Sequence, residues 1–289
     1  MTTLITALLL GSLTLLVLTA AVGVGAMVLS PARVPAALAD GAIVVAAGSR
    51  TTLRRGLITG ILIAFVLIAL AVLLRSILAG RAPWSNLHEF SMAFAAALLG
   101  TYLVLARTNP IAGLAPFVAL LAAGLVGFTI GLDDRVDPLV PALQSPLLVI
   151  HVGSAALAYA VAGVAFLAAA AELGQRATAD GIGLLPSAET ARAVGHRAVL
   201  IAFPILTIAI ALGSVWANLA WRSYWSNDPK ELAAAATWLV FGAYLHVAGR
   251  RDRWEQLAPW LIVLGFVGVL FTYIGAGLFF IGEHSYAAP

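Results

Sequence analysis

Long apolar segments separated by short polar stretches run along the whole chain. Eight of them are long enough to cross a bilayer, and a segment in lipid must be helical because its backbone finds no other hydrogen-bond partner there. The predicted spans are Leu4–Leu29, Gly56–Leu78, Phe90–Ala106, Ile111–Leu132, Leu147–Ala171, Ala198–Ala217, Pro229–Ala248 and Ala258–Ile281. We therefore predict an all-α fold, a polytopic transmembrane helix bundle of about eight spans that forms one integral membrane domain over residues 1–289.

Composition supports this class of protein. Of the 289 residues, 62% are hydrophobic and 10% charged, and the mean hydropathy is +1.02, whereas about a quarter of a soluble domain is charged. The absence of cysteine excludes disulfides, thiolate metal sites and thiol redox chemistry. The net charge of +3 gives no indication of a nucleic-acid partner. No basic residue precedes Arg33, and the first apolar run is longer than the core of a signal peptide, so we expect an uncleaved first span.

Basic residues are distributed unevenly between the two sets of connections. One set carries Arg33, Arg50, Arg54, Arg55, Arg107, Arg176, Arg192, Arg197, Arg250, Arg251 and Arg253, and the other carries Arg75, Arg81, Arg135, Arg222 and Lys230. Because connections rich in Lys and Arg stay in the cytoplasm, we expect the first set inside, and both termini outside.

An aromatic and polar stretch, residues 216–231 (WANLAWRSYWSNDPKE), lies between the sixth and seventh spans on the expected outer side. It holds three of the seven Trp. Asp228 as N-cap, Pro229 at the first helical position and Glu231 two residues later predict a capping box. Trp221 and Trp225 are four residues apart and share a face if that piece is helical. The competing interpretation is an aromatic belt at the membrane interface.

This stretch resembles the WWD signature of haem-handling membrane proteins, WAxxxWGxxWxWDPKE. The matching residues are Trp216, Ala217, Trp221, Trp225, Asp228, Pro229, Lys230 and Glu231. Arg222 stands where the signature usually has Gly, and Asn227 stands where it has Trp.

Other segments extend the resemblance from about residue 54 to the end of the chain. They are Pro83–Glu89 (PWSNLHE, similar to PxSNLYE), Pro138–Ser145 followed by Ile150-His151-Val152 and Tyr159, and Gly277-Leu278 followed by His284-Ser285-Tyr286. The sequence is therefore similar to the CcsA (ResC) family of System II cytochrome c biogenesis.

The resemblance implies a site for haem b. His151 and His284 match the family's two external ligands of the haem iron, and His246 matches its membrane-embedded ligand. It also implies that Trp216, Trp221, Trp225 and Asp228 contact the macrocycle, and that a CcsB (ResB) subunit supplies the second ligand opposite His246. No catalytic acid or base is predicted.

The residues themselves support part of this assignment. His151 and His284 lie on the same expected side as the Trp stretch, and imidazole is a common axial haem ligand. His246 lies within a span, where an ionisable residue is a functional candidate. His88 and His196 are expected to be solvated or hydrogen-bonded. Arg222 and Lys230 are candidates to pair with haem propionates.

We thus expect a haem-handling subunit of a cytochrome c synthase, the thioether-forming lyase complex of the plasma membrane. It would deliver haem across the membrane and present it, on the extracytoplasmic side, to the CxxCH segment of apocytochrome c, with a thioredoxin-like reductant as a further partner. The alternative is a haem exporter or another small-solute transporter, which predicts repeats and broken helices at mid-membrane. A scaffold without a cofactor leaves His246 unexplained.

Overall fold

The structure, a computed structural model, describes residues 1–29, 40–179, 181–250, 254–280 and 282. Within these ranges it is helical and contains no strand, as predicted. The helices are α1 (Thr2–Leu29), α2 (Asp40–Ala79), α3 (Leu87–Thr108), α4 (Ala115–Ile130), α5 (Pro146–Ala177), α6 (Ala188–Trp221), α7 (Pro229–Val247), α8 (Trp254–Leu270) and α9 (Ala276–Phe279). Two short 3-10 turns, η1 (Ala112–Leu114) and η2 (Pro141–Leu143), precede α4 and α5, and a π-helical turn, η3 (Phe271–Gly275), joins α8 to α9.

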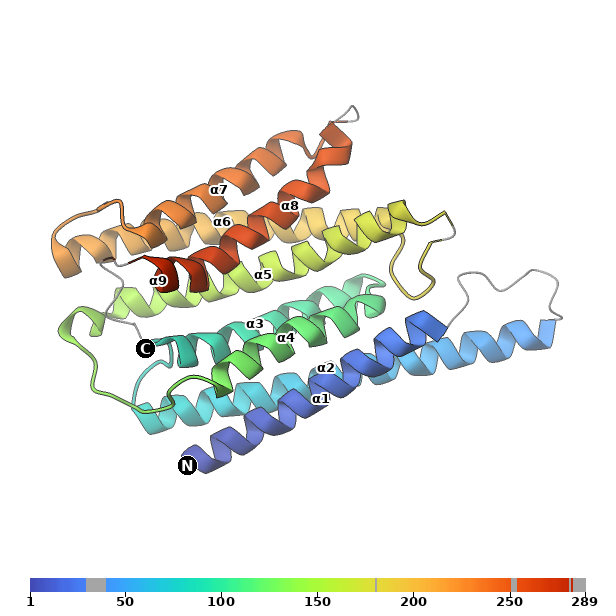
Figure 1. The fold of residues 1–289 in the computed structure, drawn as a ribbon, viewed down its shortest axis with the longest axis horizontal. Coiled ribbons are helices and arrows are strands. Elements are labelled where there is room, and N and C mark those ends of the chain that lie inside the picture. The colour runs from blue at the N-terminus through green and yellow to red at the C-terminus, as the bar shows by residue number, and fades with distance from the viewer. Residues whose placement is uncertain (30–39, 180, 251–253, 281, 283–289) are drawn as a thin grey trace.

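The helices form an elongated bundle in two groups (Figure 1). α1 to α4 pack on one another, α5 to α8 form the second group, and α3 against α5 joins the two. The contact between α5 and α6 is the most extensive. A Cβ added to Gly195 would lie 3.6 Å from Cβ of Ala168 across this contact, which shows how closely the two backbones approach.

Among the described residues, seven helical segments are long and apolar enough to span a membrane. They correspond to seven of the eight predicted spans, so the chain is a multi-pass membrane protein. The remaining predicted span, Pro229–Ala248, is helical as α7 but is not among the seven. Its first turn contains Lys230 and Glu231 and its last turn contains His246, and these residues lower its mean hydropathy.

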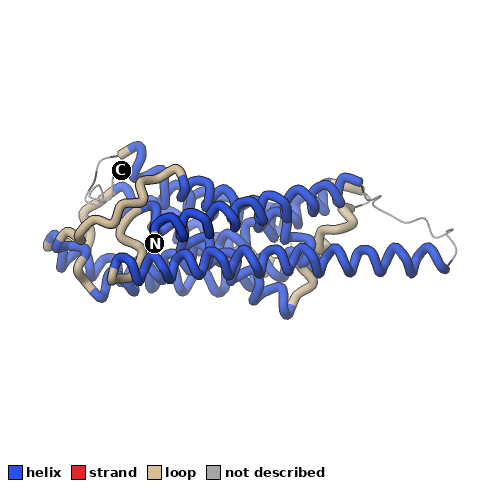
Figure 2. Tube along the Cα trace, turned by 90° about the horizontal axis from the view of Figure 1, so that it is seen from below, coloured by secondary structure: helices blue, strands red, loops and turns tan. Residues whose placement is uncertain are grey.

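Several helices are longer than the apolar patterns predict. α2 has 40 residues, which corresponds to about 60 Å at 1.5 Å per residue, roughly twice the thickness of a bilayer's hydrocarbon core. It projects beyond the rest of the bundle (Figures 1 and 2). α6 likewise begins at Ala188 and ends at Trp221, beyond both limits of the predicted span. Apolar periodicity locates the membrane-crossing part of a helix, not its polar extensions.

The connections alternate between the two ends of the bundle (Figure 1). The start of α1 and the connections α2–α3, α4–α5 and α6–α7 lie at one end, which we call the motif end. The helix ends at Leu29, Thr108, Ala177 and Val247 lie at the other. The five basic residues that the sequence assigns to one side therefore lie at the motif end, and the described Arg of the larger set lie toward the opposite end.

Candidate functional site

A cavity opens at the motif end between the two groups of helices. It has a volume of about 1210 Å³, including the part open to solvent, and its walls come from α3, α5, α6, α7, η3 and the connections between them. Its lining is mainly aromatic and aliphatic, and includes Trp84, His151, Tyr159, Trp216, Tyr224, Trp225, Lys230 and Tyr273. A concave apolar site with few polar groups is the usual form of a ligand-binding pocket.

His151, in the second turn of α5, forms part of the cavity wall. Its Nδ1 donates a hydrogen bond to the carbonyl oxygen of Ala209 on α6, 2.7 Å away. A carbonyl can only accept, so Nδ1 carries the proton, and in the neutral ring Nε2 carries none. A Cβ added to Gly213 would lie 2.6 Å from Cε1 of His151, so the ring packs directly on the α6 backbone. These contacts fix both the orientation and the tautomer of the imidazole.

Trp216 extends the wall beside His151. The two rings are stacked, with centroids 6.3 Å apart and planes 12° apart. Trp216 is 1% exposed, and its Nε1 donates to the carbonyl oxygen of Ala142 in η2 at 3.0 Å. Trp221 meets Trp216 edge to face, with centroids 4.9 Å apart, but does not itself line the cavity. The result is a layered aromatic wall anchored to the α4–α5 connection.

The α6–α7 connection is shorter than the whole motif. The first six residues of the motif, 216–221, belong to α6. This helix ends because Arg222 adopts the left-handed conformation (φ 64°). Trp225 therefore lies in the connection and not on the same helix as Trp221. The helical condition under which the two rings would share a face is not met. Trp225 is 41% exposed, and its Nε1 donates to Oδ1 of Asn227 at 2.9 Å. Asn227 also has a positive φ (59°), which Asn tolerates better than most residues.

Arg222 and Asn227, the two departures from the signature, thus both have left-handed backbone conformations. The signature's usual Gly at position 222 suits that conformation without strain, and Asn at position 227 provides the acceptor for Trp225. Asn227 therefore holds one Trp of the motif by a side-chain hydrogen bond.

The predicted capping box at the start of α7 is confirmed. Oδ1 of Asp228 accepts from the backbone N–H of Lys230 (2.8 Å), and Oε2 of Glu231 accepts from the N–H of Asp228 (3.2 Å) and of Ser226 (2.8 Å). Asp228 is 5% exposed and does not line the cavity. A Cβ added to Gly282 would lie 2.2 Å from Oδ2 of Asp228, so the chain after α9 contacts this carboxylate.

Of the remaining predicted ligands, His246 lies away from the cavity. His246 is exposed in the last turn of α7, where its Nε2 lies 3.4 Å from the guanidinium of Arg250. Ala234 is the last residue of α7 that lines the cavity, so His246 is separated from it by about 18 Å of helix at 1.5 Å per residue. His284 lies outside the described residues. The structure thus brings together His151, Trp216 and Trp225, with Trp221 and Asp228 behind them.

The other two histidines make the hydrogen bonds expected of them. His88 is buried, and its Nδ1 donates to the carbonyl oxygen of Thr129 at 3.1 Å. Nδ1 of His196 lies 3.1 Å from the hydroxyl of Tyr244. Neither lines the cavity.

Three further aromatic residues that line the cavity are absent from the predicted site. Trp84 precedes α3, Tyr159 is on α5, and Tyr273 is in η3, where its hydroxyl is hydrogen-bonded to Ser91. Trp84 and Tyr159 fall in the segments that carry the family resemblance, which is the signal that points to them. No sequence pattern reveals the π-helical turn that brings Tyr273 to the cavity, although such turns are frequent at functional sites.

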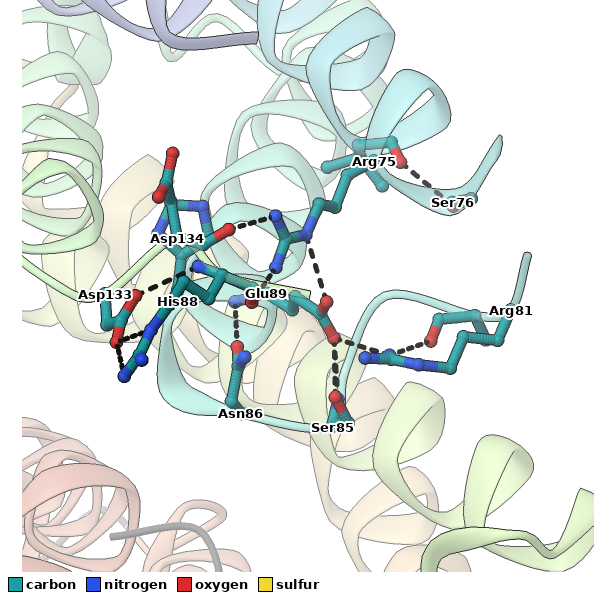
Figure 3. Close-up of polar contacts among 12 residues, drawn as sticks. Arg75, Ser76, Arg81, Ser85, Asn86, His88, Glu89, Asp133 and Asp134 are labelled. Carbon is teal, nitrogen blue, oxygen red and sulfur yellow. Dashed lines mark hydrogen bonds and ion pairs between the residues drawn. The ribbon is translucent and has the colours of Figure 1, made fainter. Parts of the chain in front are cut away.

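A buried charged cluster that includes Arg75 of α2 (Figure 3) is joined to the cavity through Ser85, a lining residue that donates to Glu89. Glu89, fully buried, accepts from Nε of Arg75 (3.0 Å) and from Arg81 (2.8 Å). Arg75 also donates to the carbonyl oxygens of Asp134 (2.5 Å) and Arg135 (2.8 Å). The cluster thereby fixes the start of the α4–α5 connection, which also carries Ala142, the acceptor of Trp216.

An exposed ion pair lies beside this cluster. Arg135 donates to Asp133 through its side chain (2.7 Å) and its backbone N–H (3.0 Å). These hydrogen bonds hold the pKa of the Asp133 carboxyl below its usual value. Because both side chains face solvent, this pair contributes little to stability.

Comparisons with known proteins identify the family. The family model described as "Cytochrome C assembly protein" matches residues 84–284. "Cytochrome c biogenesis protein CcsA" of Parasynechococcus marenigrum (strain WH8102) is 35% identical over 239 residues, 72% of this chain and 78% of that protein. The protein of the same description from Synechococcus sp. (strain CC9605) is 34% identical over 274 residues, 84% and 89% of the two chains. The protein of the same description from Chlamydomonas reinhardtii is 35% identical over 236 residues, which cover 76% of this chain and 65% of that protein.

A solved structure shares the fold. "Cytochrome c Heme Lyase CcmF" superposes with a TM-score of 0.62 at 19% identity, over 93% of this chain and 46% of that chain. The present chain therefore spans less than half of that protein's length. The family match covers the cavity, the motif stretch and the helices that carry them, and the relatives match over most of their own length. The chain belongs to the cytochrome c assembly protein family, and within it to the CcsA group.

Proposed function

We propose that this chain is the haem-handling subunit of a cytochrome c synthase, which delivers haem across the membrane and presents it for covalent attachment to apocytochrome c. The observation that carries the proposal is the fixed orientation of the His151 ring at the cavity wall. The ring is held by Ala209 with Nε2 as the unprotonated nitrogen, and it is stacked on Trp216 at the wall of an aromatic cavity. An imidazole in that tautomer is the form that ligates iron.

The cavity fits a flat, largely apolar macrocycle. Trp84, Trp216, Trp225, Tyr159 and Tyr273 provide aromatic surface from several helices and connections, and aromatic rings favour stacked or edge-to-face contact with another ring system. In this proposal the ligand is haem b, and its two vinyl groups accept the cysteine thiols of the client. Each thioether forms when sulfur bonds to one vinyl carbon and the thiol proton goes to the other.

Two further histidines complete the proposed set of ligands. His284 is the second external ligand, and Gly282, two residues before it, contacts Asp228 beside the cavity. His246 is the ligand at the other end of α7. Its exposure leaves it accessible to a CcsB (ResB) subunit, which in this proposal supplies the opposite ligand.

The proposed orientation follows from the charges. The end opposite the cavity carries the larger set of Arg, and such an end stays in the cytoplasm. The cavity then faces the extracytoplasmic side of the plasma membrane, where the CxxCH segment of apocytochrome c and a thioredoxin-like reductant have access to it. The protein's own contribution is orientation of the macrocycle and control of the iron environment.

The experiment is an absorption spectrum of the chain purified with its partner subunit. The wild-type complex should contain haem, His151→Ala and His284→Ala should each contain less, and added imidazole should partly restore it. His196→Ala is the matched control, since His196 is hydrogen-bonded to Tyr244 away from the cavity. A haem-free complex that matures cytochrome c at the normal rate would refute the proposal.

A further inference from the structure

Lys230 contributes a cationic group to the aromatic cavity. It is the second residue of α7 and is half-buried, and it lines the cavity together with Glu231 and Ala234 from the first turns of that helix. The amino end of α7 thus adjoins the cavity. The partial positive charge of a helix amino end adds to that of the ammonium group, and both favour an anion.

The neighbouring carboxylates are already engaged with the backbone. Glu231 accepts from the N–H groups of Ser226 and Asp228, and Asp228 accepts from the N–H of Lys230. Within the described part of the chain, no carboxylate oxygen lies within 4 Å of the Lys230 ammonium. The capping box therefore orders the loop, and the charge of Asp228 acts on Lys230 without forming an ion pair with it.

Arg222, the other basic residue of the motif, is placed differently. It is exposed, adopts the left-handed conformation at the end of α6, and does not line the cavity. Arg75 and Arg81 are paired with Glu89 and do not line it either. Among the described residues that line the cavity, Lys230 is the one Lys or Arg.

We propose that Lys230 forms a carboxylate subsite of this cavity and pairs with a propionate of the bound tetrapyrrole. The inference rests on the proposed function, since it assumes that the cavity binds haem. The subsite would make a free carboxylate on the macrocycle a requirement for tight binding. Apolar walls accept any macrocycle of the right shape, whereas the ammonium group and the α7 amino end discriminate in favour of one with a free carboxylate. A partly desolvated ammonium forms a stronger ion pair than one in water.

The test is a comparison of haem with haem dimethyl ester, in which both carboxylates are blocked. Each is titrated into the haem-depleted complex with the partner subunit, and binding is followed by absorbance and by quenching of Trp fluorescence. The wild type should bind haem about 10- to 100-fold more tightly than the ester, which is the range expected for one charged hydrogen bond. This wild-type preference needs no variant, so it tests the subsite even if a substituted protein fails to fold.

Three variants assign that preference to a residue. Lys230→Gln should bind haem more weakly and lose the preference for haem over its ester, while its affinity for the ester stays the same. Lys230→Arg should keep the preference. Arg222→Gln, which removes a charge from the same connection outside the cavity, should behave like the wild type.

The outcomes separate the two proposals. If haem binds in a His151-dependent manner but Lys230→Gln retains the full preference, or the wild type has none, the subsite is refuted and the proposed function stands. If the wild-type complex binds neither ligand, the proposed function fails and the subsite with it.

Discussion

Nδ1 of His151 donates to the carbonyl oxygen of Ala209 at 2.7 Å, across the contact between α5 and α6. This hydrogen bond sets which ring nitrogen carries the proton. It also couples the imidazole to the part of α6 that leads into the motif, so that the position of one helix controls the chemistry of a residue on the other.

Gly213→Ala should disturb His151 without removing it. The new Cβ would lie 2.6 Å from Cε1 of the ring, so the imidazole must move and its hydrogen bond to Ala209 weakens. We expect haem affinity to fall about 10- to 100-fold, as is typical when a residue that orients a ligand is changed. The measurement is a haem titration of the complex. Gly124→Ala is the control, because no atom lies within 4 Å of its added Cβ, and an equal loss in both variants would contradict the prediction.

Trp216→Phe should destabilise the fold. It removes the hydrogen bond to the half-buried carbonyl oxygen of Ala142, which contributes about 0.5–1.5 kcal/mol, while an aromatic ring remains beside His151. Trp225→Phe removes an exposed hydrogen bond to Asn227 and should change stability by less than about 0.5 kcal/mol. Thermal unfolding in detergent, followed by circular dichroism, compares the two. Equal effects would show that η2 does not depend on Trp216.

Glu89→Gln should be among the most destabilising substitutions at the motif end. It leaves the buried guanidinium of Arg75 without its counter-charge, at a cost of about 3–5 kcal/mol. Asp133→Asn breaks the neighbouring exposed pair with Arg135 and should leave stability unchanged. The yield of folded, monodisperse protein and its unfolding temperature report the difference. A Glu89→Gln protein as stable as Asp133→Asn would be incompatible with a structural role for the cluster.

Arg222→Gly should stabilise the chain. It removes the left-handed strain at the end of α6, and after the entropy cost of Gly in the unfolded state the expected gain is about 1 kcal/mol. Asn227→Gly should gain less, because Asn already tolerates this conformation and the hydrogen bond to Trp225 is lost. A lower unfolding temperature for Arg222→Gly would show that its side chain makes a contribution that outweighs the strain.

His246→Ala should act only in the presence of the partner subunit. Within this chain, His246 is exposed and its contact is with Arg250, so the unfolding temperature of the isolated chain should stay the same. Under the proposed function, the complex should lose the haem bound at that level and keep the His151 site. A drop in stability of the isolated chain would instead assign His246 a structural role.

The sequence predicts the architecture well, for a physical reason. Apolar runs in lipid must be helical, and consecutive spans place their connections at alternate ends of the bundle. Counting the spans therefore predicts that Trp216 and His151 lie at the same end. The cap at Asp228 is also predictable, because its residues are adjacent in sequence. The haem-ligand roles came from the family resemblance and stay predictions.

Long-range and irregular features could not be predicted. The pairing of Glu89 with Arg75 joins two helices, and the sequence shows only that both residues lie at the same end. Tyr273 reaches the cavity through a π-helical turn, and the extension of α6 to Trp221 depends on Arg222 adopting a left-handed conformation. Each of these depends on contacts that periodicity does not encode.

The π-helical turn at Phe271–Gly275 has a consequence for the end of the chain. An α-helix advances about 100° around its axis per residue, and a π turn accommodates an extra residue within the turn. The turn therefore shifts the helical phase, and it sets the direction in which α9 continues from α8. In this phase Gly282 arrives at Asp228. Were the turn α-helical, α9 would be rotated by roughly a quarter of a revolution about its axis, and Gly282 would not lie at Asp228.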